Sequence, residues 1–130
     1  MKFHQEFFTN EPIFVIQKHD TEIAGLHFDL RLEFNGVLQS WVLRKVPPTS
    51  IGIKRLAIPV ADHLLSWANF TGEIKHGYGK GTVSLWDRGF VNWEKTLPPL
   101  IFNLSGKKLH HRYTLLPYNG NFLFYKLCRN

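Results

Sequence analysis

The sequence predicts a mainly β protein: a compact, closed or partly closed β-barrel of about eight strands with short helical turns. Two observations predict it. Short runs of alternating apolar and polar residues recur along the chain between turns that contain glycine or proline. In contrast, no stretch has a sustained apolar period of 3.6 residues. Seven or eight such strands must hide their edges, and they do so most economically by closing into a barrel or packing as a sandwich.

The first half of the chain is expected to form a strand followed by a hairpin. Ile13 to Gln17 is a short run rich in β-branched residues, which predicts a strand. Two alternating runs between Leu26 and Arg44 flank Asn35-Gly36, the dipeptide that best tolerates the positive φ angles of a tight turn. A β-hairpin is therefore expected from Leu26 to Arg44.

The second half is expected to add strands, a helical turn and a second hairpin. A helical turn is predicted within Pro59 to Phe70, around Leu64-Leu65-Ser66-Trp67. The last two runs flank a second Asn-Gly dipeptide, Asn119-Gly120, and are expected to pair as a hairpin. The strands expected here are Leu56 to Ala61, Thr82 to Trp86, Phe90 to Trp93, Leu109 to Leu116 and Phe122 to Leu127.

Length and composition indicate one globular domain. The 130 residues, 44% of them hydrophobic and 20% charged, suit a single domain over residues 1–130 with residues 1–12 as an N-terminal arm. The single cysteine, Cys128, excludes a disulfide framework or a zinc-thiolate cluster within one chain. No apolar run approaches the roughly 18 residues that span a bilayer, and the N-terminus lacks a signal-type stretch. We therefore expect a cytoplasmic monomer without membrane contact.

The charge balance favours an anionic partner. Sixteen Lys and Arg residues against ten Asp and Glu residues give a formal charge of +6. Long-range attraction then favours polyanions such as nucleic acids. Because many basic proteins bind no polyanion, the charge alone does not decide between nucleic-acid binding and other functions.

Chemistry-bearing residues are concentrated in the run from His27 to Glu33. Side chains alternate along a strand, so His27, Asp29 and Arg31 share one face, and the apolar residues between them form a core stripe on the other. Imidazole and carboxylate ligands suit Mn²⁺ or Zn²⁺. The guanidinium suits a phosphate bound by the same ion. The pattern fits a metal-dependent phosphoesterase, but on its own it favours a solvent-facing strand whose charged residues serve solubility and cross-strand pairing.

A second imidazole supports the metal site. His19 follows the first predicted strand, and it can return beside His27 if the segment from Asp20 to Leu26 is a loop. His19, His27 and Asp29 would then form a set of two imidazoles and one carboxylate. Several divalent ions accept such a set.

Several ordered motifs resemble one known family. Phe14 to His19, Leu26 to Glu33 and Gly36 to Trp41 are similar to segments of the 3′-phosphoesterase domain of bacterial DNA ligase D and its stand-alone archaeal relatives. The similarity covers about residues 13 to 126. The later motifs, in the same order as in the family, are Lys54-Arg55-Leu56-Ala57, Asp62-His63, Gly77 to Val83 and Trp86-Asp87-Arg88-Gly89.

The resemblance implies a site as well as a fold. It implies a compact β-barrel whose metal, Mn²⁺ with Zn²⁺ or Co²⁺ as alternatives, is held by His19, His27 and Asp29. It further implies a catalytic phosphate pocket, in which Arg31 and Arg55 would neutralise charge and His63 would act as general acid or hydrogen-bond donor. The full set of implied phosphate-pocket residues is Arg31, Lys45, Arg55 and His63.

The implied function is the processing of 3′ ends in DNA repair. The substrates would be the 3′ ends of DNA or RNA-tipped DNA primer-templates, from which terminal ribonucleosides and then 3′-phosphates are removed to leave a 3′-OH. A separate repair ligase, polymerase or Ku protein would act in trans, as in non-homologous end joining. The alternatives are a non-catalytic nucleic-acid-binding β-barrel, for which charge and aromatic content suffice, and a cupin-like metal barrel acting on a small molecule.

Three departures from the family pattern bear on the activity. His19 and His27 are eight residues apart instead of the family's usual six, which implies a longer loop. Leu64-Leu65-Ser66-Trp67 replaces a run whose tyrosine lies in the active site, and indole donates but cannot accept a hydrogen bond. Lys75-His76-Gly77-Tyr78 replaces an acidic stretch. Whether both the diesterase and the monoesterase steps operate depends on these substitutions.

Overall fold

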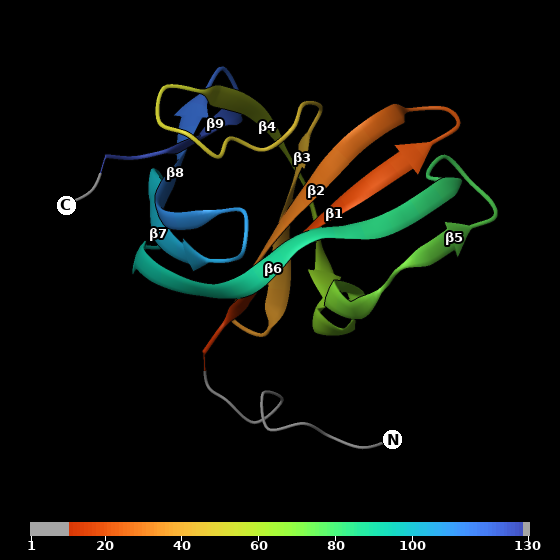
Figure 1. Cartoon of the computed structure of the whole chain (residues 1–130), viewed down its shortest axis with the longest axis horizontal. Helices are drawn as coiled ribbons and strands as arrows, with labels where there is room; N and C mark the ends of the chain where they lie inside the picture. The colour runs from red at the N-terminus through yellow and green to blue at the C-terminus, as the bar shows by residue number, and fades with distance from the viewer. Residues whose placement is uncertain (1–10, 129–130) are drawn as a thin grey trace.

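The computed structural model describes residues 11–128, which form nine β-strands and one short 3-10 helix, η2 (Figure 1). Residues 1–10 of the predicted N-terminal arm lie outside the described residues. Within residues 11–128, no helix has the length and apolar character needed to cross a bilayer. The elements are β1 (Ile13–Thr21), β2 (Gly25–Phe34), β3 (Val37–Leu43), β4 (Lys54–Leu64), η2 (Leu65–Asn69), β5 (Gly72–Ile74), β6 (Gly81–Lys95), β7 (Leu100–Ser105), β8 (His110–Tyr118) and β9 (Asn121–Lys126).

The strands close into an antiparallel barrel, which confirms the predicted fold class. The order is β1-β2-β3-β4-β9-β8-β7-β6, and β6 pairs back onto β1. Closure therefore uses eight strands, while the short β5 adds to β6 outside the ring. Figure 1 shows β6 as one long ribbon that runs beside β1 and then curves toward β7.

Two Asn-Gly turns confirm the predicted hairpins. Asn35 and Gly36 have φ angles of 53° and 80°, and Asn119 and Gly120 have φ angles of 48° and 80°. Left-handed backbone of this kind costs glycine little and asparagine less than most residues. The turns join β2 to β3 and β8 to β9.

Several predicted boundaries were wrong. Thr82 to Trp86 and Phe90 to Trp93 belong to one strand, β6, because β1 and then β7 supply pairing partners along its length. Gly89 is not a turn: its backbone lies against the Ser105 carbonyl, where a side chain would not fit. The expected loop from Asp20 to Leu26 is shorter, because β1 continues to Thr21 and β2 begins at Gly25. β5 and β7 were not predicted; the helical turn was, and it is η2.

The main apolar core fills the barrel. A smaller apolar cluster lies outside this core, on the faces of β1 and β3 that point away from it. Val15 and Leu38, on β1 and β3, pack with Ala68 of η2, so η2 is seated on this outer face. Trp41 belongs to the main core, and Trp86 and Trp93 pack against it. The main core comprises Phe14, Ile16, Phe28, Leu30, Leu32, Trp41, Leu43, Ala57, Val91, Leu100, Phe102, Leu104, Leu109, Tyr113, Leu115 and Phe124.

Candidate active site

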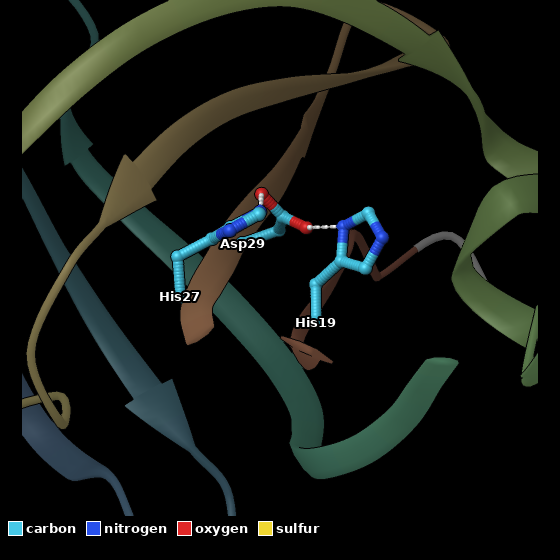
Figure 2. Close-up of side chains that lie close together, drawn as sticks. All are labelled: His19, His27 and Asp29. Carbon is cyan, nitrogen blue, oxygen red and sulfur yellow. Dashed lines mark ion pairs between the residues drawn. The ribbon is translucent and has the colours of Figure 1, made fainter. Parts of the chain in front are cut away.

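The β1–β2 hairpin brings the three predicted metal ligands together. Antiparallel register places His19 directly opposite His27, with ring centroids 4.8 Å apart. Asp29 lies two residues further along β2, on the same face as His27. Figure 2 shows the Asp29 carboxylate between the two imidazole rings. The unusual eight-residue spacing is therefore accommodated by a cross-strand pair and a short turn.

The donor atoms have a separation that suits a divalent ion. His19 Nδ1 lies 3.5 Å from Asp29 Oδ2, and His27 Nε2 lies 3.4 Å from Asp29 Oδ1. One ligand atom from each of the three residues falls within 4.8 Å of the others. Two atoms that each bind an ion at about 2.1 Å in tetrahedral geometry are about 3.4 Å apart. The group thus fits a divalent cation such as Mn²⁺, Zn²⁺ or Co²⁺.

A backbone carbonyl selects the tautomer of His19 that can bind metal. His19 Nε2 lies 2.9 Å from the Gly79 carbonyl oxygen. Because a carbonyl only accepts, Nε2 carries the proton in this contact, and Nδ1 is the ring nitrogen that faces Asp29. Outer hydrogen bonds of this kind orient metal-binding histidines. The loop before β6, which the sequence indicated only as a turn, therefore contributes to the site.

The pocket face of β2 is buried, which contradicts the interpretation of this strand as a solvated surface. His27, Asp29 and Arg31 are 9%, 6% and 4% exposed. Burial alone would raise the pKa of Asp29, but a hydrogen bond from His27 and the charge of Arg31 outweigh it and lower the pKa below 3.8. Asp29 is therefore ionised at neutral pH, the form that binds a metal.

Arg31 is fixed beneath the pocket by uncharged partners. Its Nε donates to Gln17 Oε1 at 2.8 Å, and its Nη1 donates to Ser40 Oγ at 2.9 Å. Its Nη2 lies 3.6 Å from Asp29 Oδ2. Sequence analysis did not identify Gln17 or Ser40. A usable signal existed for Gln17, since it alternates in phase with His19 and pairs with Asp29 across β1 and β2.

His63 joins this network from β4. Its Nδ1 lies 3.1 Å from Arg31 Nη1 and 3.0 Å from the Ala61 carbonyl. The Arg31 guanidinium only donates and the Ala61 carbonyl only accepts, so these two contacts favour opposite tautomers of the ring. Burial and then the Arg31 charge lower the pKa of His63 below 6.5, against an opposing contribution from Ala61. The folded protein therefore favours the neutral ring.

These residues line one cavity of about 460 Å³ with a polar floor and apolar walls. Cavities of this size accommodate small ligands. Trp67 forms part of the wall; its ring stacks on Phe70 at 4.6 Å and lies 5.8 Å from the His63 ring. The lining residues are His19, Thr21, Ala24, His27, Asp29, Arg31, Val42, Arg44, Val60, His63, Trp67, Ile74, Tyr78, Gly79 and Val83.

Two predicted phosphate ligands are not brought to this cavity. Lys45 is exposed beyond the end of β3 and does not line the cavity. Arg55, on β4, donates its Nε to the Val46 carbonyl at 2.7 Å and is likewise absent from the lining. Arg44, which sequence analysis did not single out, lines the cavity instead. Phosphate binding by Lys45 and Arg55 therefore stays a prediction from the resemblance.

Comparison with known proteins confirms the resemblance seen in the motifs. The model of the DNA Ligase D 3′-phosphoesterase domain family matches residues 17–117. The "Multifunctional non-homologous end joining protein LigD" of Pseudomonas aeruginosa is 42% identical over 115 residues, covering 82% of this chain and 13% of that protein. The corresponding "DNA repair protein LigD" of Mycobacterium tuberculosis is 40% identical over 114 residues, covering 83% of this chain and 15% of that protein. The chain thus spans only a small part of each relative.

Proposed function

The chain belongs to the family of DNA ligase D 3′-phosphoesterase domains, and from that premise we propose that it is a hydrolase that processes the 3′ ends of DNA for repair. Its substrates would be primer-template ends that carry a terminal ribonucleoside or a 3′-phosphate, and its product a 3′-OH. The observation that carries the proposal is the convergence of His19, His27 and Asp29 on the floor of a cavity that Arg31 and His63 also line.

His19, His27 and Asp29 are the proposed ligands of the metal, Mn²⁺ in the first place. Their donor separations and the protonated Nε2 of His19 support this assignment. When bound, the ion supplies positive charge that polarises a phosphoryl oxygen. Zn²⁺ and Co²⁺ suit the same donors, so availability would decide among the three ions.

Arg31 and His63 are the proposed groups that stabilise charge on the reacting phosphate. Hydrolysis of a phosphoester increases negative charge on the phosphoryl oxygens, and donors already fixed in place stabilise that charge without reorganisation. Gln17 and Ser40 hold the Arg31 guanidinium, and the His63 ring lies against it. These contacts support a role for Arg31 as a donor to phosphate and for His63 as its neighbour in the same pocket.

The apolar walls suit the sugar and base of a terminal nucleotide. Trp67 stands where the family pattern has a tyrosine, and its indole cannot accept a hydrogen bond. We therefore expect the removal of ribonucleosides and the removal of 3′-phosphates to proceed at different rates, and the assay uses a separate substrate for each reaction. A ligase, a polymerase or Ku would act with it, in keeping with the end-joining role in the relatives' names.

The test is an end-processing assay on 5′-labelled primer-templates. One substrate ends in a single 3′ ribonucleotide and the other in a 3′-phosphate, each incubated with Mn²⁺, Zn²⁺, Co²⁺ or EDTA. We expect a metal-dependent 3′-phosphate intermediate and 3′-OH product from the first, and a 3′-OH product from the second. Binding of DNA without product under every metal would instead identify a non-catalytic nucleic-acid-binding barrel.

Matched variants test the residue assignments. His19→Ala, His27→Ala and Asp29→Ala should abolish turnover while the circular dichroism spectrum stays that of the wild type. His76→Ala and Asp20→Ala, both exposed and outside the cavity lining, should retain turnover. Full activity in all three ligand variants would exclude the proposed metal centre.

A further inference from the structure

We propose that Arg44 binds the first internucleotide phosphate on the 5′ side of the reacting 3′ end. This inference rests on the proposed function, because it assigns the path of the substrate strand out of the same cavity. It concerns a residue that neither the sequence motifs nor the family resemblance identified. Three features of the structure carry it: the position of Arg44, its lack of partners and the charge of the cavity lining.

Arg44 lies at the rim of the cavity, on the side of the metal group. It follows directly after β3, one residue beyond the pair formed by Leu43 and Phe28. Ser40 and Val42 precede it at two-residue intervals, and the face they share carries the partner of Arg31 and one wall of the cavity. Extension of the β2–β3 register would place Arg44 across from His27, so its guanidinium can reach a group just outside the metal site.

The Arg44 guanidinium is unpaired. Among the arginines of residues 11–128, Arg44 alone has neither a hydrogen bond nor an ion pair within the chain. Arg31, Arg55, Arg88 and Arg112 are each held by other residues. An exposed guanidinium at a cavity rim therefore keeps its five donors for a ligand.

The lining of the cavity favours an anion at this position. Among residues 11–128, Asp29 is the only acidic residue in the lining, and His27, His19 and Arg31 already surround its carboxylate. Besides Arg31, Arg44 is the only lysine or arginine of residues 11–128 in the lining. Lys45 and Arg55 lie outside it, so Arg44 is the unpaired cation of this cavity that a substrate strand can reach.

The chemistry of the substrate identifies which phosphate this is. When a terminal 3′-phosphate is in the metal site, no nucleotide follows it, so every other phosphate of that strand lies on the 5′ side. The same holds for a terminal ribonucleoside, which carries no phosphate beyond the linkage that is cut. A guanidinium recognises a phosphate through paired hydrogen bonds, and the nearest such group is the first internucleotide phosphate.

The experiment is a double-mutant cycle between Arg44 and that phosphate. A fluorescent DNA strand ends in a 3′-methylenephosphonate, whose P–C bond is not hydrolysed, so binding is measured without turnover in the presence of Mn²⁺. In a second strand the first internucleotide linkage is an uncharged methylphosphonate. Fluorescence anisotropy gives Kd for wild-type protein, Arg44→Ala, Arg44→Lys and Lys54→Ala. Lys54→Ala removes the same charge from β4, outside the cavity lining.

We expect Arg44→Ala to weaken binding of the fully charged strand by about tenfold and to leave binding of the methylphosphonate strand nearly unchanged. The slope of log K against log salt should fall in magnitude by about 0.7 for the charged strand. Arg44→Lys should restore part of the affinity, because an ammonium keeps the charge but not the paired geometry. Lys54→Ala should weaken both strands equally and slightly.

Equal weakening of both strands by Arg44→Ala, or no weakening of either, would overturn the proposal. Turnover of an unmodified 3′-phosphate strand is followed in parallel. If the strand is turned over but Arg44→Ala affects the charged and the methylphosphonate strand alike, the role of Arg44 is rejected and the enzyme assignment stays intact. If Arg44→Ala weakens only the charged strand but no strand is turned over, the role of Arg44 in strand binding is supported and the enzyme assignment is rejected.

Discussion

Both faces of β2 are buried, but they differ in what makes them stable. Phe28, Leu30 and Leu32 enter the barrel core, whereas His27, Asp29 and Arg31 form the floor of the cavity. On the core face, each buried apolar side chain contributes about 1.5–3 kcal/mol through removal from water. On the cavity face, the desolvation of charges offsets most of their mutual attraction. One strand thus supplies stability with one face and chemistry with the other.

The comparison predicts that substitutions on the two faces separate activity from stability. Changes on the core face should lower the free energy of unfolding and leave the turnover of folded molecules intact. Changes on the cavity face should lower turnover far more than stability. The four predictions below run from the largest expected effect to the smallest.

Asp29→Asn should have the largest effect on turnover. The substitution keeps the size of the side chain but removes the charge of a proposed metal ligand. Metal ions stabilise charge in a transition state by several kcal/mol, so we expect a loss of about a thousandfold or more in kcat. Saturating Mn²⁺ at about 100 times its Kd should stabilise the wild type by about 2.7 kcal/mol, and the variant much less.

End-processing kinetics and thermal unfolding with and without Mn²⁺ measure the two effects. Asp20→Asn provides the control, because Asp20 is exposed on β1 and lies outside the ligand group. A variant at position 29 that kept wild-type turnover and the full Mn²⁺-dependent stabilisation would contradict the metal assignment.

Leu30→Ala should have the largest effect on stability. Leu30 is fully buried in the main core, between Asp29 and Arg31 in sequence but on the other face of β2. Removal of a buried leucine side chain costs about 2–5 kcal/mol, depending on how far the cavity left behind collapses. Urea unfolding measures this loss. Turnover per folded molecule at low temperature should stay within a few-fold of the wild type, and a loss as large as that of Asp29→Asn would refute the separation of the two faces.

Sequence patterns predicted most of the fold because its turns have strong local signals. Asn35-Gly36 and Asn119-Gly120 both adopt positive φ angles, and the two hairpins follow from them. The continuity of β6 could not be predicted, because it depends on β1 and β7, which are distant in sequence and pair with different parts of the strand. Gly89 indicates a turn locally, yet a close approach of the backbone near Ser105 explains it.

The site was predictable where strand alternation or the family resemblance identified residues. His27, Asp29 and Arg31 follow from alternation, and His19 joins them through the register of the hairpin. Their burial was not predictable, because η2 and the loop before β6 cover this face only in the folded chain. Uncharged residues such as Gln17 and Ser40 gave no chemical signal of their own. Arg44 lines the cavity, whereas Lys45 and Arg55 do not, and this difference depends on the path of the chain after β3.

Gln17→Leu tests whether the cavity face depends on a buried amide for its geometry. Gln17 Nε2 donates to the Trp67 carbonyl at 2.8 Å and the Phe70 carbonyl at 3.3 Å, while Oε1 accepts from Arg31. Leucine would remove all three hydrogen bonds, at a cost of about 1–3 kcal/mol in stability. Loss of the anchor of Arg31 should lower kcat by about 10- to 100-fold, as for other outer-shell partners.

Gln17→Glu separates the two contributions of this side chain. A carboxylate can still accept from Arg31 but cannot donate to the two carbonyls. If anchoring of Arg31 matters most, kcat should recover relative to Gln17→Leu while stability does not. Equal loss of turnover in both variants would show that the tether to η2, and not the anchor of Arg31, controls activity.

Substitution of His63 should have the smallest effect. It should change how the stability of the fold depends on pH, which substitutions on the core face should not do. Burial and the Arg31 charge lower its pKa in the folded protein below 6.5, so the folded state favours the neutral ring. Below 6.5 the unfolded state binds more protons, and stability therefore falls as the pH drops from 6.5 through the folded pKa. His63→Asn keeps an acceptor for Arg31 but does not titrate, so the difference in melting temperature between wild type and variant should shrink or reverse between pH 7.5 and 5. A difference independent of pH would mean that the folded protein does not favour the neutral form of His63.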